Sequence, residues 1–173
     1  MPKPKSSSFV PKDYEVNTGG SDFFKLQPGD NKFRILTDAV IGKEGWKDNK
    51  PFRRGGVDAE IDVDEVDEDE KSGKPKINDF MAFYVLDHSD GKIKVAQFNQ
   101  ASIRKELVKY ASDSDWGHPE NYDITITKSG EGLTTKYSFK ASPPKPLAPA
   151  NEKLVAAASP TFDLEGALSI DAE

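Results

Sequence analysis

The sequence predicts a mainly β protein in which five strands form a small barrel and one helix lies between the third and fourth strands. Three patterns carry this prediction. Two alternating apolar segments within Asp79–Phe98 meet at Asp90-Gly91, a dipeptide that tolerates positive φ and is typical of hairpin turns. Apolar residues in Gln100–Ala111 recur at the spacing of one helix face. Tyr122–Thr127 alternates between polar and apolar residues as a half-buried strand does.

The part of the chain before the hairpin contains a tail, one clear strand and an acidic segment. Residues 1–22 are rich in Pro, Lys, Ser and Gly without periodicity, which predicts a flexible arm. Asn31–Thr37 alternates as a first strand, whereas Ile41–Asn49 contains two glycines and is interpreted as a loop. Lys50–Val57 is expected to be a short edge segment, because the proline at its second position cannot donate a ladder hydrogen bond. Asp58–Lys76 is an acidic, low-complexity insertion.

The hairpin separates its side chains into two faces. With Asp90-Gly91 as the loop, Leu86 lies opposite Val95 and Phe83 opposite Phe98, whereas a loop at Ser89-Asp90 moves the partners by two and keeps the faces. One face is apolar and is interpreted as core: Tyr84, Leu86, Ile93 and Val95. The other face mixes rings with lysines, as a surface that stacks bases and holds phosphates requires: Phe83, Val85, Lys92, Lys94 and Phe98.

The elements after the hairpin complete the predicted domain. A helix is expected over Gln100–Ala111 with Asn99 as its N-cap. Strands follow at Tyr122–Thr127 and Thr134–Lys140, separated by a glycine-containing turn. Three prolines shortly after the last strand end the regular structure.

The order of these elements indicates a fold. If Lys50–Val57 is an embellishment, the order β-β-β-α-β-β is that of an OB-fold, a partly open five-stranded barrel. We therefore expect an OB-fold domain over residues 23–141 that includes the acidic loop 58–76. Residues 142–173 are then a linker and a disordered acidic tail.

Length and composition exclude several classes of protein. A chain of 173 residues is long enough for one domain with tails. The absence of cysteine excludes disulfides, thiolate zinc sites and cysteine nucleophiles. No apolar run approaches the ~18–20 residues of a membrane span, and the first residues, MPKPKSSSFVPK, lack the apolar segment of a secretory signal. We expect a soluble, cytoplasmic protein with no membrane partner.

The net charge of −6 is unevenly distributed along the chain. Residues 58–70 hold nine acidic residues and no basic one, and residues 141–173 carry a net charge of −3. Without these two segments the remainder has a net charge of +6, so the expected folded body is basic.

This basic body offers a set of candidate nucleic-acid contacts. Rings stack bases of any sequence, and Lys and Arg hold phosphates. The candidates are Arg34, Trp46, Lys50, Arg53, Arg54, Phe83, Lys92, Lys94, Phe98 and Lys136. Two alternatives stay open at this point: Phe83 and Phe98 can be an ordinary cross-strand pair, and Trp46 can cap the end of the barrel.

The sequence favours no catalytic, metal-binding or cofactor-binding role. His88 and His118 are the only histidines, and both lie in expected turns. The acidic run in residues 58–70 does not place ligands, Gly and Glu at the offsets of an EF-hand loop, so we expect a solvated, mobile loop. No nucleophile-elbow, Walker-type or H-E-x-x-H motif is present. We expect a protein that is not an enzyme and has no cofactor.

The C-terminal part divides into two segments. Ser142–Ala158 is a Pro- and Ala-rich linker, and Ser159–Glu173 is acidic with a few apolar residues. Such a peptide suits docking to a basic groove of a partner protein, although a disordered solubility tail fits equally well. The candidate partner-binding residues are Phe162, Asp163, Leu164, Glu165, Leu168, Ile170 and Asp171.

Together these residues carry a resemblance to a known family. NKFRIL, KPFRR, FMAFYVLDHSDGKIKVAQFNQASI and DWGHPENYDITITKSGEGLTTKYSFKASPPKPL resemble the phage-type single-stranded DNA-binding proteins with an OB-fold, over residues 23–147. The resemblance implies sequence-independent binding of single strands during viral DNA replication, recombination and repair, in the host cytoplasm. It also implies an acidic C-terminal tail that recruits replication or recombination proteins. The long acidic loop fits this family less readily.

The expected function is therefore non-catalytic binding of single-stranded DNA. Carried over by chemistry and face parity, the binding residues are Arg34, Trp46, Arg53, Arg54, Lys92, Lys94 and Phe98. The alternatives are a protein-interaction module of a replication or assembly complex, and a single-stranded RNA binder. Both a monomer and a dimer, with or without cooperative binding to DNA, agree with the sequence.

Overall fold

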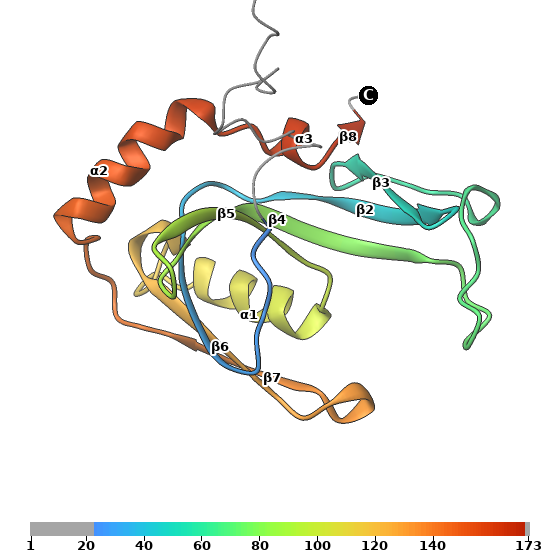
Figure 1. Ribbon diagram of the computed structural model, residues 1–173, viewed down its shortest axis with the longest axis horizontal. Helices are drawn as coiled ribbons and strands as arrows, with labels where there is room; N and C mark the ends of the chain where they lie inside the picture. Colours follow the sequence, from blue (N-terminus) through green and yellow to red (C-terminus); the bar gives the residue numbers. More distant parts are fainter. Residues whose placement is uncertain (1–22, 172–173) are drawn as a thin grey trace, which may run out of the picture.

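The computed structural model describes residues 23–171, and these residues form a mainly β protein with seven antiparallel strands in an open sheet, a short eighth strand and three α-helices (Figure 1). The strands are β1 Gly29–Ile35, β2 Val40–Lys47, β3 Lys50–Gly55, β4 Ile77–Asp87, β5 Lys92–Phe98, β6 Asp123–Ser129, β7 Lys136–Ala141 and β8 Ile170–Asp171. The helices are α1 Ala101–Ala111, α2 Pro149–Ala158 and α3 Leu164–Ala167. Single 3-10 turns occupy Val63–Glu65, Pro119–Asn121, Gly132–Thr134 and Ser159–Thr161. The flexible arm expected for residues 1–22 lies outside the described residues.

The sheet is organised around β4. Its strands follow the order β7-β6-β1-β4-β2-β3-β8, and β5 pairs with the other edge of β4. Along one edge, residues 77–82 of β4 pair with β2 and residues 85–87 pair with β1. Strands β1 and β2 therefore pair with successive parts of the same edge of β4, and the chain bends between them.

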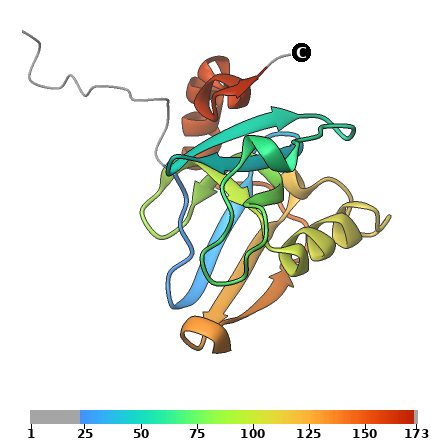
Figure 2. The same ribbon diagram turned by 90° about the vertical axis from the view of Figure 1, so that its right-hand side faces the viewer.

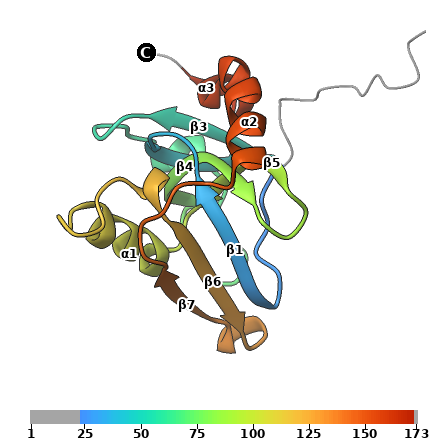
Figure 3. The same cartoon turned by 90° about the vertical axis from the view of Figure 1, so that its left-hand side faces the viewer.

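The prediction of a mainly β protein is confirmed, and a helix forms where the periodicity placed one. Helix α1 follows β5 and packs beside β7, and it buries Ile103 and Leu107 in the interior (Figure 3). Its N-cap is Gln100 instead of the expected Asn99. No pairing between β5 and β7 occurs within residues 23–171, so closure into a five-stranded barrel stays a prediction. None of the helices in these residues is both long and apolar enough to span a bilayer.

The loop predicted for residues 41–49 is wrong, because most of it forms β2. Strand β2 makes a hairpin with β3, and the two turn residues Asp48 and Asn49 have φ angles of 52° and 63°, as a type I′ turn requires. Gly45 lies within the strand, where a Cβ atom would come within 2.7 Å of side-chain atoms of Phe52 and Val66. Glycine occurs there for close packing, whereas sequence reasoning took it as a sign of a loop.

The β4–β5 hairpin has the register of the shifted loop. Asp87 pairs with Lys92 and Tyr84 with Val95, so the loop is His88–Gly91 and Phe83 lies opposite Ala96. The division of side chains into two faces is as predicted, because the two registers differ by two residues.

The prediction that the aromatic face of the hairpin, with Phe83 and Phe98, is exposed to solvent is wrong. Phe83 and Phe98 are 1% and 3% exposed and belong to the main apolar core, called here the inner cluster. The buried members of this cluster are Phe24, Phe33, Ile35, Phe83, Val85, Ala96, Phe98, Ile103, Leu107, Tyr122, Ile124, Ile126 and Ala141. The Phe98 ring contacts three other phenylalanine rings, with centroid separations between 5.8 and 6.4 Å. Aromatic pairs at these separations stabilise a core and leave no ring face for a ligand.

The opposite face of the hairpin carries a second apolar core, called here the outer cluster. Its buried members are Leu36, Phe80, Ala82, Tyr84, Leu86, Val95 and Leu168. The cover is the C-terminal part of the chain: α2, α3 and β8 run along one side of β5, β4 and β3, whereas α1 lies on the other side (Figure 1). The expectations of a linker through residue 158 and of a disordered tail are therefore wrong for residues 149–171.

We predict that Phe98→Ala lowers the free energy of unfolding by about 3–5 kcal/mol, the usual cost of emptying a buried phenylalanine site. Urea unfolding followed by circular dichroism measures the change. Leu133→Ala is the matched control, because the Leu133 side chain is fully exposed and its truncation should be close to neutral. Equal stability of the Phe98→Ala variant and the parent protein would contradict a core position for this ring.

Candidate nucleic-acid interface

A polar network occupies the end of the outer face that is nearest the β2–β3 hairpin. The buried carboxylate of Glu44 lies at its centre and accepts hydrogen bonds from Gln97 Nε2 at 2.7 Å and Asn99 Nδ2 at 3.1 Å. Arg53 Nη2 lies 3.0 Å from Glu44 Oε2, and Arg53 Nε donates to Gln97 Oε1 at 2.8 Å. Trp46 Nε1 also donates to Glu44, at 3.3 Å. These bonds fix a half-buried tryptophan and a guanidinium side by side on one face of the sheet.

The C-terminal segment lies on the same face and contacts this network. Phe162 stacks on Tyr84 with ring centroids 4.2 Å apart and an angle of 14° between the planes. The Tyr84 hydroxyl accepts a hydrogen bond from the Asp163 backbone N–H at 3.1 Å. Arg53 Nη1 donates to the Leu168 carbonyl at 2.8 Å, and β8 pairs in parallel with β3. The Phe162 ring of this acidic segment thus occupies the face of Tyr84 on which a base could stack.

Several cations predicted to contact nucleic acid are instead engaged by carboxylates. Arg34 is buried, and its Nε donates to Asp123 Oδ1 at 2.9 Å. Lys94 Nζ lies 2.8 Å from Asp87 and 2.7 Å from Asp90.

The predicted set is also dispersed over the molecule. Lys50, Lys92 and Lys136 are exposed and make no ion pair within the part of the chain that the structure describes. Lys50 belongs to the β2–β3 hairpin, and Lys136 follows the β6–β7 turn, on the other side of the molecule (Figure 2). Of the ten candidates, Trp46 and Arg53 are the pair that the structure brings together on the outer face.

Sequence reasoning missed the three polar contributors to this face. The prediction that Tyr84 belongs to a core is confirmed, whereas Asn99 is predicted only as a helix N-cap and Glu44 and Gln97 receive no role. Gln97, the last residue but one of β5 and flanked by the buried Ala96 and Phe98, is the signal that could have found the network, because a partly buried amide needs partners.

The acidic loop between β3 and β4 is folded, which corrects the expectation of a solvated loop. Ile61 and Val66 are buried, and the Glu65 carboxylate accepts two hydrogen bonds from Arg54, both at 2.7 Å. These bonds, together with one from the Asp62 backbone N–H, lower the pKa of Glu65 to about 2. The pKa of Asp67 is also lowered, mainly by the hydrogen bond from the Asp48 backbone N–H. The loop is therefore attached to the β2–β3 hairpin through its acidic residues.

A second charged group lies under the chain that follows β7. Asp123 is buried, and burial raises the pKa of its carboxyl, but hydrogen bonds from His88 and Arg34 outweigh burial and hold it below its usual value. His88 Nε2 lies 2.8 Å from Asp123 Oδ1, so the histidine has a structural partner. The part of the chain that the structure describes contains no group of three or more His, Cys, Asp or Glu side chains that could hold a metal.

Comparison with curated proteins finds a relative in a bacteriophage. A protein of Escherichia phage T5, named "Probable ssDNA-binding protein", is 29% identical over 156 residues, a match that covers 75% of this chain. This chain resembles a viral DNA-binding protein. The similarity confirms the resemblance inferred from the sequence motifs. This chain spans 60% of the length of the phage T5 protein. No family model matches this chain.

We predict that the acidic loop stays attached to Arg54 well into acid. The Glu65 carboxylate has a lowered pKa, so its contribution is present above pH 4.5, the usual value, and is lost as the pH falls towards about 2. NMR of the Arg54 Nε–H resonance against pH should give a midpoint near 2, and Glu65→Gln should remove this titration. A midpoint near 4.5 would mean that the pair does not form in solution.

Proposed function

We propose that this protein binds single-stranded DNA without sequence specificity. The observation that carries the proposal is the similarity to the phage T5 protein named "Probable ssDNA-binding protein". The outer face supports it, because Trp46 and Tyr84 supply rings and Arg53 a cation on one surface of the sheet. Bases stack on rings whatever their sequence, and cations hold the phosphates.

We further propose that the domain is an OB-fold barrel. The five strands would be β1 with β2, then β4, β5, β6 and β7, with α1 between β5 and β6. Support comes from the neighbour order β7-β6-β1-β4-β5, with α1 beside β7 at the opening, as expected of a partly open barrel. Strand β3 and the acidic loop would then be insertions after the first strand.

In this proposal, DNA and the C-terminal segment compete for the outer face. Phe162 covers the ring of Tyr84, and Leu168 takes a hydrogen bond from Arg53, so a strand can reach both side chains only when the segment leaves. The released segment, with Phe162, Leu164, Leu168 and Ile170, would be free to recruit replication or recombination proteins. Protection of DNA during replication, recombination and repair is the corresponding role.

A second candidate function also has support from one observation. The outer face holds an acidic, apolar-anchored peptide of the same chain, which is how a protein-interaction module would hold a partner peptide. A module of this kind would bind acidic peptides and ignore single strands. The titration described next separates the two functions.

We predict that unlabelled oligo-dT quenches the tryptophan fluorescence and that its affinity falls with salt. The expected slope of log K against log salt is about −0.7 for each phosphate contact. The titration is repeated at several salt concentrations, with oligo-U and duplex DNA as competitors. A salt-independent affinity, or a preference for the duplex, would contradict the proposal, and a preference for oligo-U would indicate an RNA binder.

The two tryptophans provide a matched control for this titration. Trp116 packs edge-on against Tyr110 and Tyr122, away from the outer face, whereas Trp46 belongs to it. Trp116→Phe should keep the quenching and Trp46→Phe should lose it. The opposite result would place the DNA on another surface.

We predict that Phe162→Ala tightens oligo-dT binding by about two- to tenfold. The reason is that an aromatic stack contributes about 0.5–1.5 kcal/mol, and its loss weakens the competing segment. Leu154→Ala on α2 is the control, because this side chain is 41% exposed and lies outside both apolar clusters, so its truncation should leave the affinity unchanged. Weaker binding by the Phe162→Ala variant would mean that the segment helps to hold DNA.

A further inference from the structure

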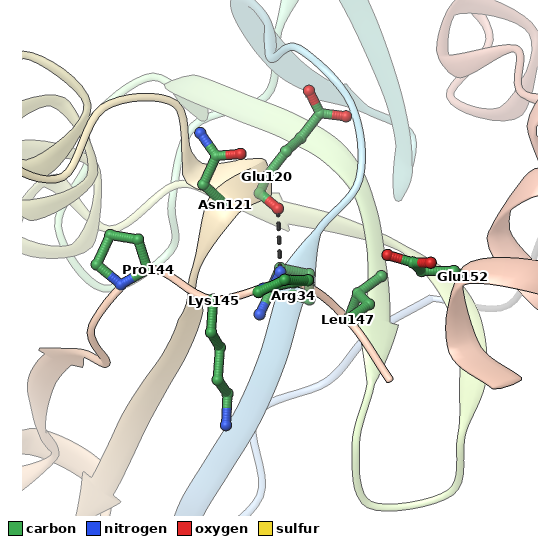
Figure 4. A pocket seen from close by; sticks show the side chains of 8 residues that line it. Arg34, Glu120, Asn121, Pro144, Lys145, Leu147 and Glu152 are labelled. Carbon is green, nitrogen blue, oxygen red and sulfur yellow. Dashed lines mark hydrogen bonds between the residues drawn. The ribbon is translucent and has the colours of Figure 1, made fainter. Parts of the chain in front are cut away.

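We propose that the hollow between β1, β6 and the first turn of α2 is a binding site for a phosphate group. The hollow has a volume of about 440 Å³, and its lining includes Lys32, Arg34, Lys145 and Asn151. It is separate from the outer face, so the proposal does not rest on the proposed function. The chain from Pro144 to Leu147 passes over Arg34 and divides this hollow from a neighbouring one (Figure 4).

Arg34 provides the first observation. Its side chain is 2% exposed, its Nε donates to Asp123 and its Nη1 donates to the Glu120 carbonyl at 3.1 Å. Its Nη2 is buried and has no hydrogen-bond partner among residues 23–171. A buried charged donor without a partner costs free energy, so a site of this kind requires an acceptor. Arg34 lines both hollows, so a ligand bound there lies beside this guanidinium, which must turn for Nη2 to reach it.

The second observation is the helix terminus. Helix α2 has ten residues, and its N-cap is Ala148, which has no side chain that can accept from the first turn. Ala148 and Asn151 line the hollow, so the positive end of the helix dipole opens on it. Pro149 has no N–H, and the Asn151 and Glu152 N–H groups donate to the Ala148 carbonyl, so the helix end contributes mainly its dipole, which favours an anion such as phosphate.

The charges around the hollow favour the same ligand. Lys32, Arg34 and Lys145 are the cations in its lining, and Asp123 is the one carboxylate. Asp123 is already engaged by Arg34, by His88 and, at 3.9 Å, by Lys32, whereas Lys145 makes no ion pair within the described residues. The carboxylates of Glu120 and Glu152 line the neighbouring hollow instead. A doubly charged, tetrahedral phosphate would place its oxygens among a guanidinium, two ammonium groups and a helix terminus.

The probe is inorganic phosphate, added to the full ¹⁵N-labelled chain, with sodium chloride at matched ionic strength as the reference. We expect saturable shifts of the amide resonances of Lys145, Leu147, Ala148 and Asn151 with phosphate and not with chloride. Shifts that fail to saturate, or that chloride reproduces, would overturn the site. Because this readout contains no DNA, it is independent of the oligo-dT titration.

A pair of charge-reversal variants locates the site. Lys145→Glu should weaken phosphate binding at least tenfold, and Lys153→Glu, an equal change at an exposed position of α2 outside the lining, should preserve it. Equal affinities of the two variants would overturn the proposal. Both positions are exposed, so the test does not depend on replacing Arg34, whose removal would leave Asp123 buried without its partner.

Further ligands distinguish the sources of the phosphate. Thymidine 5′-monophosphate, but not thymidine, should produce the same shifts if a nucleotide supplies the group. A 5′-phosphorylated oligo-dT that competes better than its 5′-hydroxyl form would identify a strand end, and equal competition by both would identify backbone phosphates. Failure of every phosphorylated ligand to compete with inorganic phosphate would contradict a biological role for the site.

Discussion

Strand β4 has apolar side chains on both faces, so each face must be covered by another part of the chain. Its odd-numbered side chains, such as Phe83, pack into the inner cluster with β1, β6 and α1. Its even-numbered side chains, such as Tyr84 and Leu86, enter the outer cluster, which the C-terminal segment covers. A strand that is apolar on both faces is typical of the middle of a layered structure and unusual at the surface of a small barrel. The second layer therefore comes from the chain itself.

The hairpin shows how far sequence reasoning reaches. Alternation fixes which side chains share a face, and this division was correct even though the register was shifted by two residues. It carries no information on which face closes on the interior, because that depends on elements far away in the sequence. Phe83 and Phe98 were for this reason assigned to the wrong environment. The helix at residues 101–111 was predictable, since its periodicity is local. Strand β2 was missed because Gly45 serves tertiary packing.

The distribution of charge along the sequence also fails to predict the charge of the folded surface. Dividing the chain into acidic and basic segments predicted a basic body, but acids and bases that are separate in sequence meet in space. Glu65 of the acidic loop holds Arg54, and Glu44 holds Arg53. Each carboxylate fixes the guanidinium that it faces and reduces its attraction for a polyanion. The potential of the candidate interface therefore depends on pairs between elements, which composition cannot reveal.

The position of the second cover in the chain has a consequence for biosynthesis. Residues 23–141 contain the seven antiparallel strands and α1, so this part leaves the ribosome before the segment that covers the outer cluster. At about 5–20 residues per second, the remaining residues up to 171 take a few seconds to be made. During this interval Tyr84, Leu86 and Val95 are exposed on the nascent chain as an apolar surface. The nascent domain is therefore most prone to aggregation, and most open to chaperones, just before its last thirty or so residues emerge.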